Sequence, residues 1–115
     1  MGNKSKLKTT GEARQFDTGA IRDCAEGKPR MSLVPHAALT AVMHRYLAGA
    51  ETYGENNWKM GMKSSVLYDS CMRHLMADWT GDESEDHLGA ALWNIMGMID
   101  NRINRPEMDD RKDFR

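Results

Sequence analysis

Residues 81–94, GDESEDHLGAALWN, hold the densest group of side chains capable of metal or acid–base chemistry. Four of the five residues from 82 to 86 are carboxylates, and His87 follows them. Carboxylates that converge from more than one helix can hold Mg²⁺ beside a phosphate. Asp86 and Asn94, eight residues apart, would share one side of a helix. The pattern is also that of a helix start, with Ser84 as N-cap and Glu85 in a dipole-favoured first turn. Both interpretations remain open.

The segment YGENNWKMG offers groups suited to a nucleobase. Tyr53 and Trp58 can stack on a base and Asn57 can hydrogen-bond to its edge. The alternative is an ordinary Gly/Asn turn in which Trp58 fills part of the core. This segment therefore predicts either one wall of a base site or a structural loop.

The segment DSCMRHLMAD combines acidic, basic and thiol groups on one helix. Asp69 and Arg73 are spaced to pair at the surface, whereas Arg73 with His74 beside an apolar stripe could reach a phosphate. Cys71 and His74 alone do not complete a zinc site. Toward the N-terminus, TGAIRDCAEGKPRM has the composition of an anion-wrapping loop, without the spacing of a P-loop or a dinucleotide fingerprint. Its cations are Arg22, Lys28 and Arg30.

Three helices are expected to position these groups. The first begins at Pro35 and stops near the Gly/Asn-rich segment 53–61, and the second begins at an N-cap at Ser64 or Ser65 and ends at Trp79 before Gly81. The third runs from Ser84 to just before Pro106, with apolar residues at helical spacing. We expect residues 1–34 to form an extended basic arm with turns, no strand and room for one short helix. Residues 35–105 would form the helical domain, and 106–115 a charged, frayed tail.

Composition sets the broad class. The chain has 115 residues, a net charge of −1, ten methionines and two cysteines, which we expect to be reduced thiols. Seven Lys/Arg against four Asp/Glu in residues 1–35 make the arm basic. The net charge of −1 argues against direct DNA or RNA binding. No apolar run is long enough for a membrane span, so a soluble cytoplasmic protein is expected.

The predicted fold class is all-α: a small bundle of three main helices with an extended N-terminal arm, assembled as a homo-oligomer. Small residues at Gly89, Ala90 and Gly97 allow close helix approach. The stripe Ile95, Ile99 and Ile103 would pack against a second chain, because three helices with broad apolar stripes bury too little surface alone.

Four stretches, taken in order, resemble one family. TGAIRDCAEGKPRMSLVPHAAL, AGAETYGENNWKMG, LYDSCMRHLMADWTGD and SEDHLGAALWNIMGMI resemble short phage and prophage proteins of the dATP/dGTP diphosphohydrolase N-terminal-domain family. The resemblance implies an all-α nucleotide-binding protein related to MazG-like enzymes. Those enzymes use a divalent metal to cleave nucleoside triphosphates between the α- and β-phosphates. Their ExxE pair is not found on the first helix here, since Glu51 and Glu55 are four residues apart around a glycine.

The resemblance implies a set of site residues. The expected catalytic residues are Asp86 and His87, and the expected ligands of Mg²⁺ or Mn²⁺ are Asp69, Glu85 and Asp86. The expected nucleotide-binding residues are Arg22, Lys28, Arg30, Tyr53, Asn57, Trp58, Arg73, His74 and Asn94. The leading hypothesis is a purine (d)NTP pyrophosphohydrolase acting in an infected bacterial host. The alternatives are a non-catalytic, cofactor-free protein that sequesters a host signalling nucleotide, and a structural helical protein.

Overall fold

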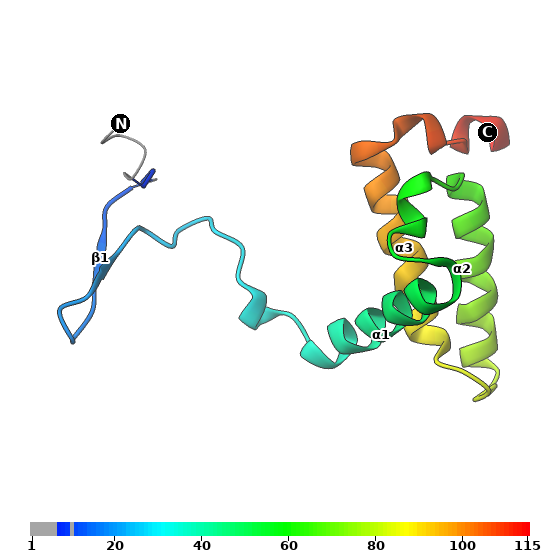
Figure 1. Cartoon of the computed structure of the whole chain (residues 1–115), viewed down its shortest axis with the longest axis horizontal. Coiled ribbons are helices and arrows are strands. Elements are labelled where there is room, and N and C mark those ends of the chain that lie inside the picture. The colour runs from blue at the N-terminus through cyan, green and yellow to red at the C-terminus, as the bar shows by residue number, and fades with distance from the viewer. Residues whose placement is uncertain (1–6, 10) are drawn as a thin grey trace. The chain divides into compact units, whose positions relative to one another are not determined.

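The computed structural model describes residues 7–9 and 11–115. They belong to two compact units, Met1–Leu33 and Val34–Arg115. Three α-helices and several 3-10 turns make the described part of the chain mainly helical, and a small hairpin is added in the first unit (Figure 1). The predicted all-α character is therefore confirmed for the second unit.

The N-terminal unit contains an antiparallel hairpin. Strand β1, Arg14–Gln15, pairs with strand β2, Ile21–Arg22, in the register Arg14↔Arg22. The expectation that the arm contains no strand is wrong. Two-residue strands are too short to show the alternation of apolar and polar residues by which strands are recognised. A single 3-10 turn, η2, follows at Met31–Leu33.

Helix α1 spans His36–Tyr53 and begins after Pro35, whose carbonyl accepts hydrogen bonds from the first turn. It ends at Gly54, where φ is 98°, a backbone conformation that only glycine adopts without strain. The chain then turns through η3, Asn57–Met60, which stops at a second positive-φ glycine, Gly61. The predicted end of the first helix is confirmed.

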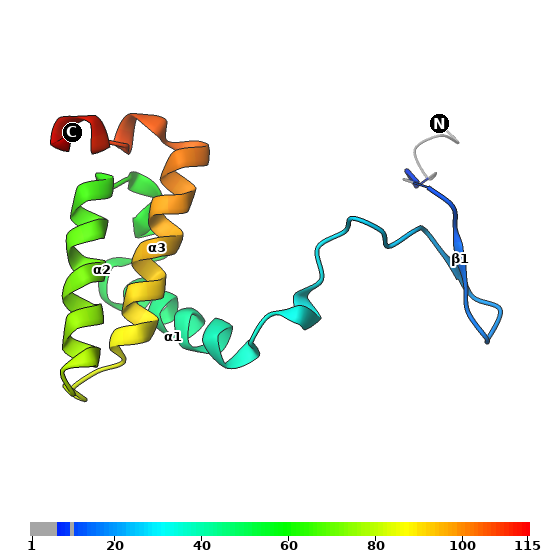
Figure 2. The same ribbon diagram turned by 180° about the vertical axis from the view of Figure 1, so that it is seen from behind.

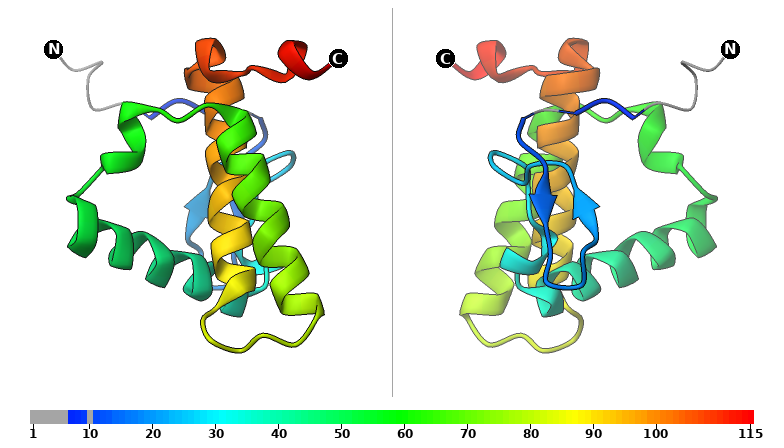
Figure 3. Two further views of the ribbon diagram at one scale, coloured as in Figure 1. Left: turned by 90° about the vertical axis from the view of Figure 1, so that its right-hand side faces the viewer. Right: turned by 90° about the vertical axis from the view of Figure 1, so that its left-hand side faces the viewer.

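Helices α2, Ser64–Trp79, and α3, His87–Asn104, lie side by side and run in opposite directions (Figures 2 and 3). Both the second and the third helix are thus confirmed, but neither begins with the predicted cap. Lys63 takes the N-cap position of α2 without a side-chain hydrogen bond. The hydroxyl of Ser64 instead accepts a hydrogen bond from Asn101 of α3.

The C-terminal segment is ordered, and the expectation of a frayed tail is wrong. It forms two 3-10 turns, η4 at Pro106–Met108 and η5 at Arg111–Phe114. Between them Asp110 is buried and accepts hydrogen bonds from the backbone N–H and hydroxyl of Ser65. The segment therefore covers the start of α2, an arrangement visible at one end of the helix pair in Figure 3.

The core of the second unit is small. Its buried apolar residues are Val42, Leu67, Cys71, Ala90 and Ala91. A Cβ on Gly97 would lie 3.0 Å from Leu67 of α2, and one on Gly89 would lie 3.4 Å from the carbonyl of Ala41 in α1. The small residues of α3 thus allow both neighbouring helices to approach closely, as predicted.

Much of the apolar periodicity remains on the surface. Exposed large apolar residues of α2 and α3 include Tyr68, Met72, Leu75, Met76, Trp79, Leu88, Ile95, Ile99 and Ile103. Extensive exposed apolar surface is usual where another chain binds. Homo-oligomerisation remains a prediction. No helix among the described residues has both the length and the apolar character to cross a membrane.

Candidate functional site

The acidic segment before α3 differs from the expected helix start. Asp86, not Ser84, is the N-cap, and its Oδ1 accepts a hydrogen bond from the backbone N–H of Gly89 at 3.0 Å. Ser84 instead donates its hydroxyl hydrogen to Asp82 at 2.8 Å. Glu85 therefore lies before the helix, and the Asp86 carboxylate is bonded to the first turn of its own helix. Asp and Ser are similarly good caps, so composition alone does not choose between them.

One cavity of about 780 Å³ lies in the second unit, where α1, η3, α2 and α3 meet. Ligand pockets for small molecules commonly have volumes of this size. Five of the predicted nucleotide-binding residues line it, although they come from four different elements. They are Tyr53, Asn57, Trp58, His74 and Asn94.

The other predicted residues lie elsewhere. Asp69 and Arg73 are exposed on α2 and do not line the cavity. Lys28 pairs with Asp23 at 2.9 Å within the N-terminal unit, which also contains Arg22 and Arg30. The roles predicted for these residues remain predictions.

Aromatic side chains form one wall of the cavity. Tyr46 lies between two tryptophans, with its ring centroid 6.1 Å from Trp58 and 5.8 Å from Trp93. Burial, and to a smaller extent the negative charge of Asp100, raises the pKa of Tyr46. Trp58 is half-buried and has the cations of Lys59 and Arg105 near its ring. The two interpretations of Trp58 are thus compatible: it packs on Tyr46 and also lines the cavity.

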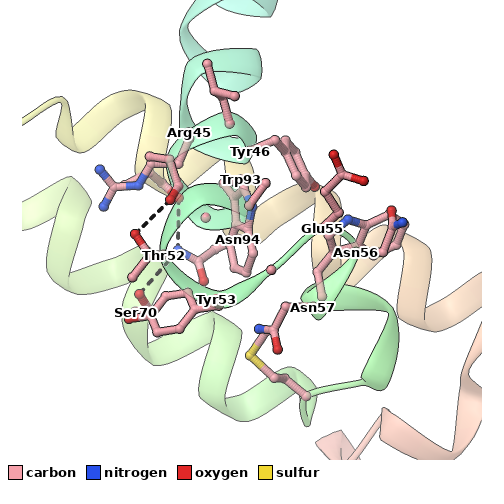
Figure 4. Close-up of a pocket in the computed structure, with 18 of the residues that line it drawn as sticks. Arg45, Tyr46, Thr52, Tyr53, Glu55, Asn56, Asn57, Ser70, Trp93 and Asn94 are labelled. Atoms are coloured by element: carbon pink, nitrogen blue, oxygen red, sulfur yellow. Dashed lines mark hydrogen bonds between the residues drawn. The ribbon is translucent and has the colours of Figure 1, made fainter.

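Asn94 is a buried polar residue in this wall. Its amide nitrogen donates to the carbonyl of Ala90 at 2.9 Å and to the hydroxyl of Ser70 at 3.2 Å (Figure 4). These bonds fix the orientation of the Asn94 amide. Its carbonyl oxygen therefore remains available to accept a hydrogen bond from a ligand. The same view shows Arg45, Thr52 and Tyr53 of α1 around this part of the cavity.

A chain of polar contacts begins at His74 in the cavity wall. Its Nδ1 lies 2.9 Å from Nδ1 of His87, which is only 6% exposed. His87 Nε2 lies 2.6 Å from a carboxylate oxygen of Asp82. Glu85 pairs with Arg45 at 2.7 Å, and Arg45 also lines the cavity.

The contacts around the two histidines shift the pKa values of the groups that make them. Burial is the main cause that lowers the pKa of His74, which favours a neutral imidazole with an available lone pair. The hydrogen bond with His87 lowers the pKa of Asp82, and the hydrogen bond from Arg45 lowers that of Glu85. Both acids are therefore held as carboxylates near neutral pH.

A possible metal-binding group also emerges. Ligand atoms of His74, Glu85 and His87 all lie within 4.8 Å of one another. Of the carboxylates predicted from the sequence, only Glu85 belongs to it; Asp69 and Asp86 do not. Sequence reasoning missed this combination because it chose only carboxylates as metal ligands and gave His74 and His87 other roles.

Sequence reasoning also did not select Arg45 and Tyr46 as pocket residues. Trp93 lies in one of the four stretches that carry the family resemblance, but it was given no role in the site. The available signal for Arg45 was a cation among the apolar positions of the first helix, eight residues before Tyr53. That signal is weak because it says nothing about which other helices the residue faces.

Together, these features define a small helical protein with a nucleotide-sized, aromatic-walled pocket beside a cluster of histidines and carboxylates. The sequence profile of the family described as dATP/dGTP diphosphohydrolase, N-terminal, matches residues 18–111. The chain belongs to this family. Comparison of the chain with curated protein sequences and with solved structures found no significant match.

Proposed function

We propose that the second unit binds a purine deoxynucleoside triphosphate in the pocket and hydrolyses it to the monophosphate and pyrophosphate. The observation that carries the proposal is the double position of His74, which lines the aromatic pocket and also contacts His87. Acid–base groups thereby adjoin a cavity large enough for a nucleotide. The family description supports this substrate class, and the reaction would draw on the cytoplasmic dNTP pool of an infected bacterium.

The pocket residues divide into groups for the base and for the phosphates. Tyr53, Trp58 and Trp93 supply aromatic surface for the base, and the amides of Asn57 and Asn94 can hydrogen-bond to its edge. Arg45 supplies a cation for the phosphates. Its guanidinium can donate hydrogen bonds to a phosphate oxygen in place of, or beside, the Glu85 carboxylate.

In the proposed reaction, a water oxygen attacks the α-phosphorus. The bond from that phosphorus to the oxygen bridging to the β-phosphorus breaks, and pyrophosphate leaves with the bridging oxygen. The water proton passes to the His74–His87 pair, where the Asp82 carboxylate stabilises the resulting positive charge. A divalent ion, when bound, supplies neutralisation of the phosphate charge.

Sequestration without cleavage is the second candidate. It is favoured by the fact that two of the carboxylates predicted to bind metal already have partners, Asp86 at the backbone of Gly89 and Glu85 at Arg45. A nucleotide held by the same aromatic and amide groups would then remain intact.

A nucleotide panel distinguishes the two candidates. The protein is incubated with each dNTP and NTP and with Mg²⁺ or Mn²⁺, then denatured, and the nucleotides are separated by chromatography. Hydrolysis yields monophosphate, whereas sequestration returns intact nucleotide. In ¹⁸O-labelled water, attack at the α-phosphorus places the label in the monophosphate, and label in pyrophosphate would contradict this step.

Arg45→Met tests the phosphate contact. Loss of a charge-assisted hydrogen bond of about 1.5–3 kcal/mol predicts a fall in kcat/KM of roughly 10- to 150-fold. Arg102→Met is the matched control, because Arg102 is exposed on α3 and does not line the pocket. Equal activity of both variants and the unmodified protein would remove Arg45 from the site.

A further inference from the structure

We infer that His74, Glu85 and His87 bind one divalent first-row transition-metal ion, with Asp82 orienting His87. The use of this ion in hydrolysis rests on the function proposed above, and the ion would take the place of proton transfer to the His74–His87 pair, because both imidazoles would then be ligands. Binding of the ion does not rest on that function. The inference begins from convergence: α2 supplies His74, and the segment entering α3 supplies Glu85 and His87. Their ligand atoms lie within 4.8 Å of one another.

The two imidazoles already have a separation suited to one ion. Their Nδ1 atoms are 2.9 Å apart, with ring centroids at 5.2 Å. Two nitrogens that each lie about 2.1 Å from one metal ion, at a right angle, are separated by about 3 Å. An ion that replaces the proton shared by His74 and His87 would need both rings to turn, because their Nδ1 atoms now face each other directly.

Asp82 supplies the outer contact typical of metal-ligating histidines. Its carboxylate lies 2.6 Å from Nε2 of His87, which makes Nε2 the protonated nitrogen and leaves the Nδ1 lone pair facing His74. Asp82 is itself held by the hydroxyl and the backbone N–H of Ser84. The turn before α3 thus fixes both the tautomer and the orientation of a buried histidine.

Glu85 completes the set without losing its partner. One of its oxygens accepts from Arg45 at 2.7 Å, and a carboxylate has a second oxygen available to a metal. Arg45 would then hold Glu85 in place while balancing its charge. Both Arg45 and His74 line the pocket, so an ion at this position would lie at the pocket wall, with its remaining coordination positions for water or phosphate oxygens.

The donor set selects the class of metal. Two imidazole nitrogens and one carboxylate suit Mn²⁺, Fe²⁺, Co²⁺, Ni²⁺ or Zn²⁺. Mg²⁺ favours oxygen ligands and retains most of its water. The site therefore differs in its ligands from the three-carboxylate site for Mg²⁺ or Mn²⁺ expected from the sequence, because only Glu85 is common to both.

Co²⁺ titration of the full chain without nucleotide tests the inference. Calorimetry should give one ion per chain, and the visible absorption of Co²⁺ should change on addition of protein and be reversed by Zn²⁺. Glu85→Gln and His74→Gln should each weaken Co²⁺ affinity by at least about tenfold. Asp82→Asn should weaken it by about 10- to 100-fold, the range found when an outer carboxylate is removed.

Matched controls separate ligation from general effects of charge and histidine content. Glu83→Gln and His44→Gln change exposed residues outside the group and should leave Co²⁺ affinity unchanged. His87 is buried, so its variants can fail to fold; Glu85 is exposed, and circular dichroism should show that Glu85→Gln keeps the helices. Absence of Co²⁺ binding, or full affinity in both Glu85→Gln and His74→Gln, would overturn the inference.

The two proposals fail in different ways. Nucleotide hydrolysis with Mg²⁺ in a protein that binds no Co²⁺ or Zn²⁺ would overturn the metal site and retain the proposed function. Co²⁺ binding that depends on Glu85 and His74, in a protein that leaves every nucleotide intact, would retain the site and overturn hydrolysis.

Discussion

Asp110 holds the start of α2 through Ser65, a residue 45 positions earlier in the chain. Its carboxylate accepts a hydrogen bond from the Ser65 backbone N–H at 2.9 Å and another from the Ser65 hydroxyl. The first N–H groups of a helix have no partner within the helix. Here a residue from the C-terminal segment satisfies one of them, so that segment and α2 are expected to unfold together.

This contact predicts a dependence of stability on acid. The hydrogen bonds from Ser65 lower the pKa of Asp110 in the folded protein. Its stabilising contribution is therefore fully present above the unfolded pKa of about 4 and is lost as pH falls through the lower, folded-state value. Asp110→Asn should lower the urea midpoint at pH 7 and should reduce its decline below about pH 4. Asp113→Asn is the control, because Asp113 lies exposed in the neighbouring turn; equal pH profiles for both variants would contradict the prediction.

Tyr53→Ala should weaken nucleotide binding while leaving the fold intact. Tyr53 ends α1, lines the pocket and is 73% exposed, so its removal costs little packing. Stacking of a base on an aromatic side chain contributes about 1–3 kcal/mol, which corresponds to a loss of roughly 5- to 150-fold in affinity by calorimetry. Tyr68→Ala, at an exposed position of α2 outside the pocket, should bind nucleotide normally.

Asp86→Ala should destabilise the protein by about 0.5–2 kcal/mol, because it removes the side chain that caps α3. Asp86→Asn retains an acceptor for the N–H of Gly89 and should be nearly neutral in urea denaturation. The same variant tests the metal role predicted from the sequence. Lost turnover with unchanged stability would support that role, and unchanged turnover would leave Asp86 as a cap alone.

Gly97→Ala should destabilise the protein by up to about 2 kcal/mol, because the added Cβ would lie 3.0 Å from Leu67 across the α2–α3 contact and this crowding is only partly offset by the better helix propensity of Ala. Gly49→Ala is the control: it lies within α1 with no atom within 4 Å of the added Cβ, and should gain up to about 1 kcal/mol. Thermal unfolding of the two variants should therefore shift in opposite directions. A stabilised Gly97→Ala variant would mean that α2 and α3 are less closely packed than described.

Ile99→Lys should dissociate the expected homo-oligomer. Ile95, Ile99 and Ile103 are all exposed on α3, and a charge in their centre would have to be buried on association. Light scattering at micromolar concentration should show a larger particle for the unmodified protein and a single chain for the variant. Met60→Lys, at another exposed apolar position, should not change the mass. A monomeric unmodified protein would refute the prediction.

The three helices could be predicted from the sequence because their signals are local. Apolar residues at helical spacing and the breaks at Gly54, Gly81 and Pro106 lie within a few residues of the structure they determine. The helix starts were less predictable. Ser84 and Asp86 are both good caps, and the group that bonds to Ser65 comes from the far end of the chain.

The candidate site, too, was predictable from the sequence only in part. Residue type and motif were enough to select Tyr53, Asn57, Trp58, His74 and Asn94, which line one pocket, while their nucleotide-binding role remains a prediction. Two contacts could not be predicted in this way. His74 and His87, thirteen positions apart on two helices, face each other, and Arg45 lies beside Glu85. Local periodicity specifies which side of a helix is apolar. Only the packing of α1 and α2 on α3 decides which polar groups at the edges of those sides meet.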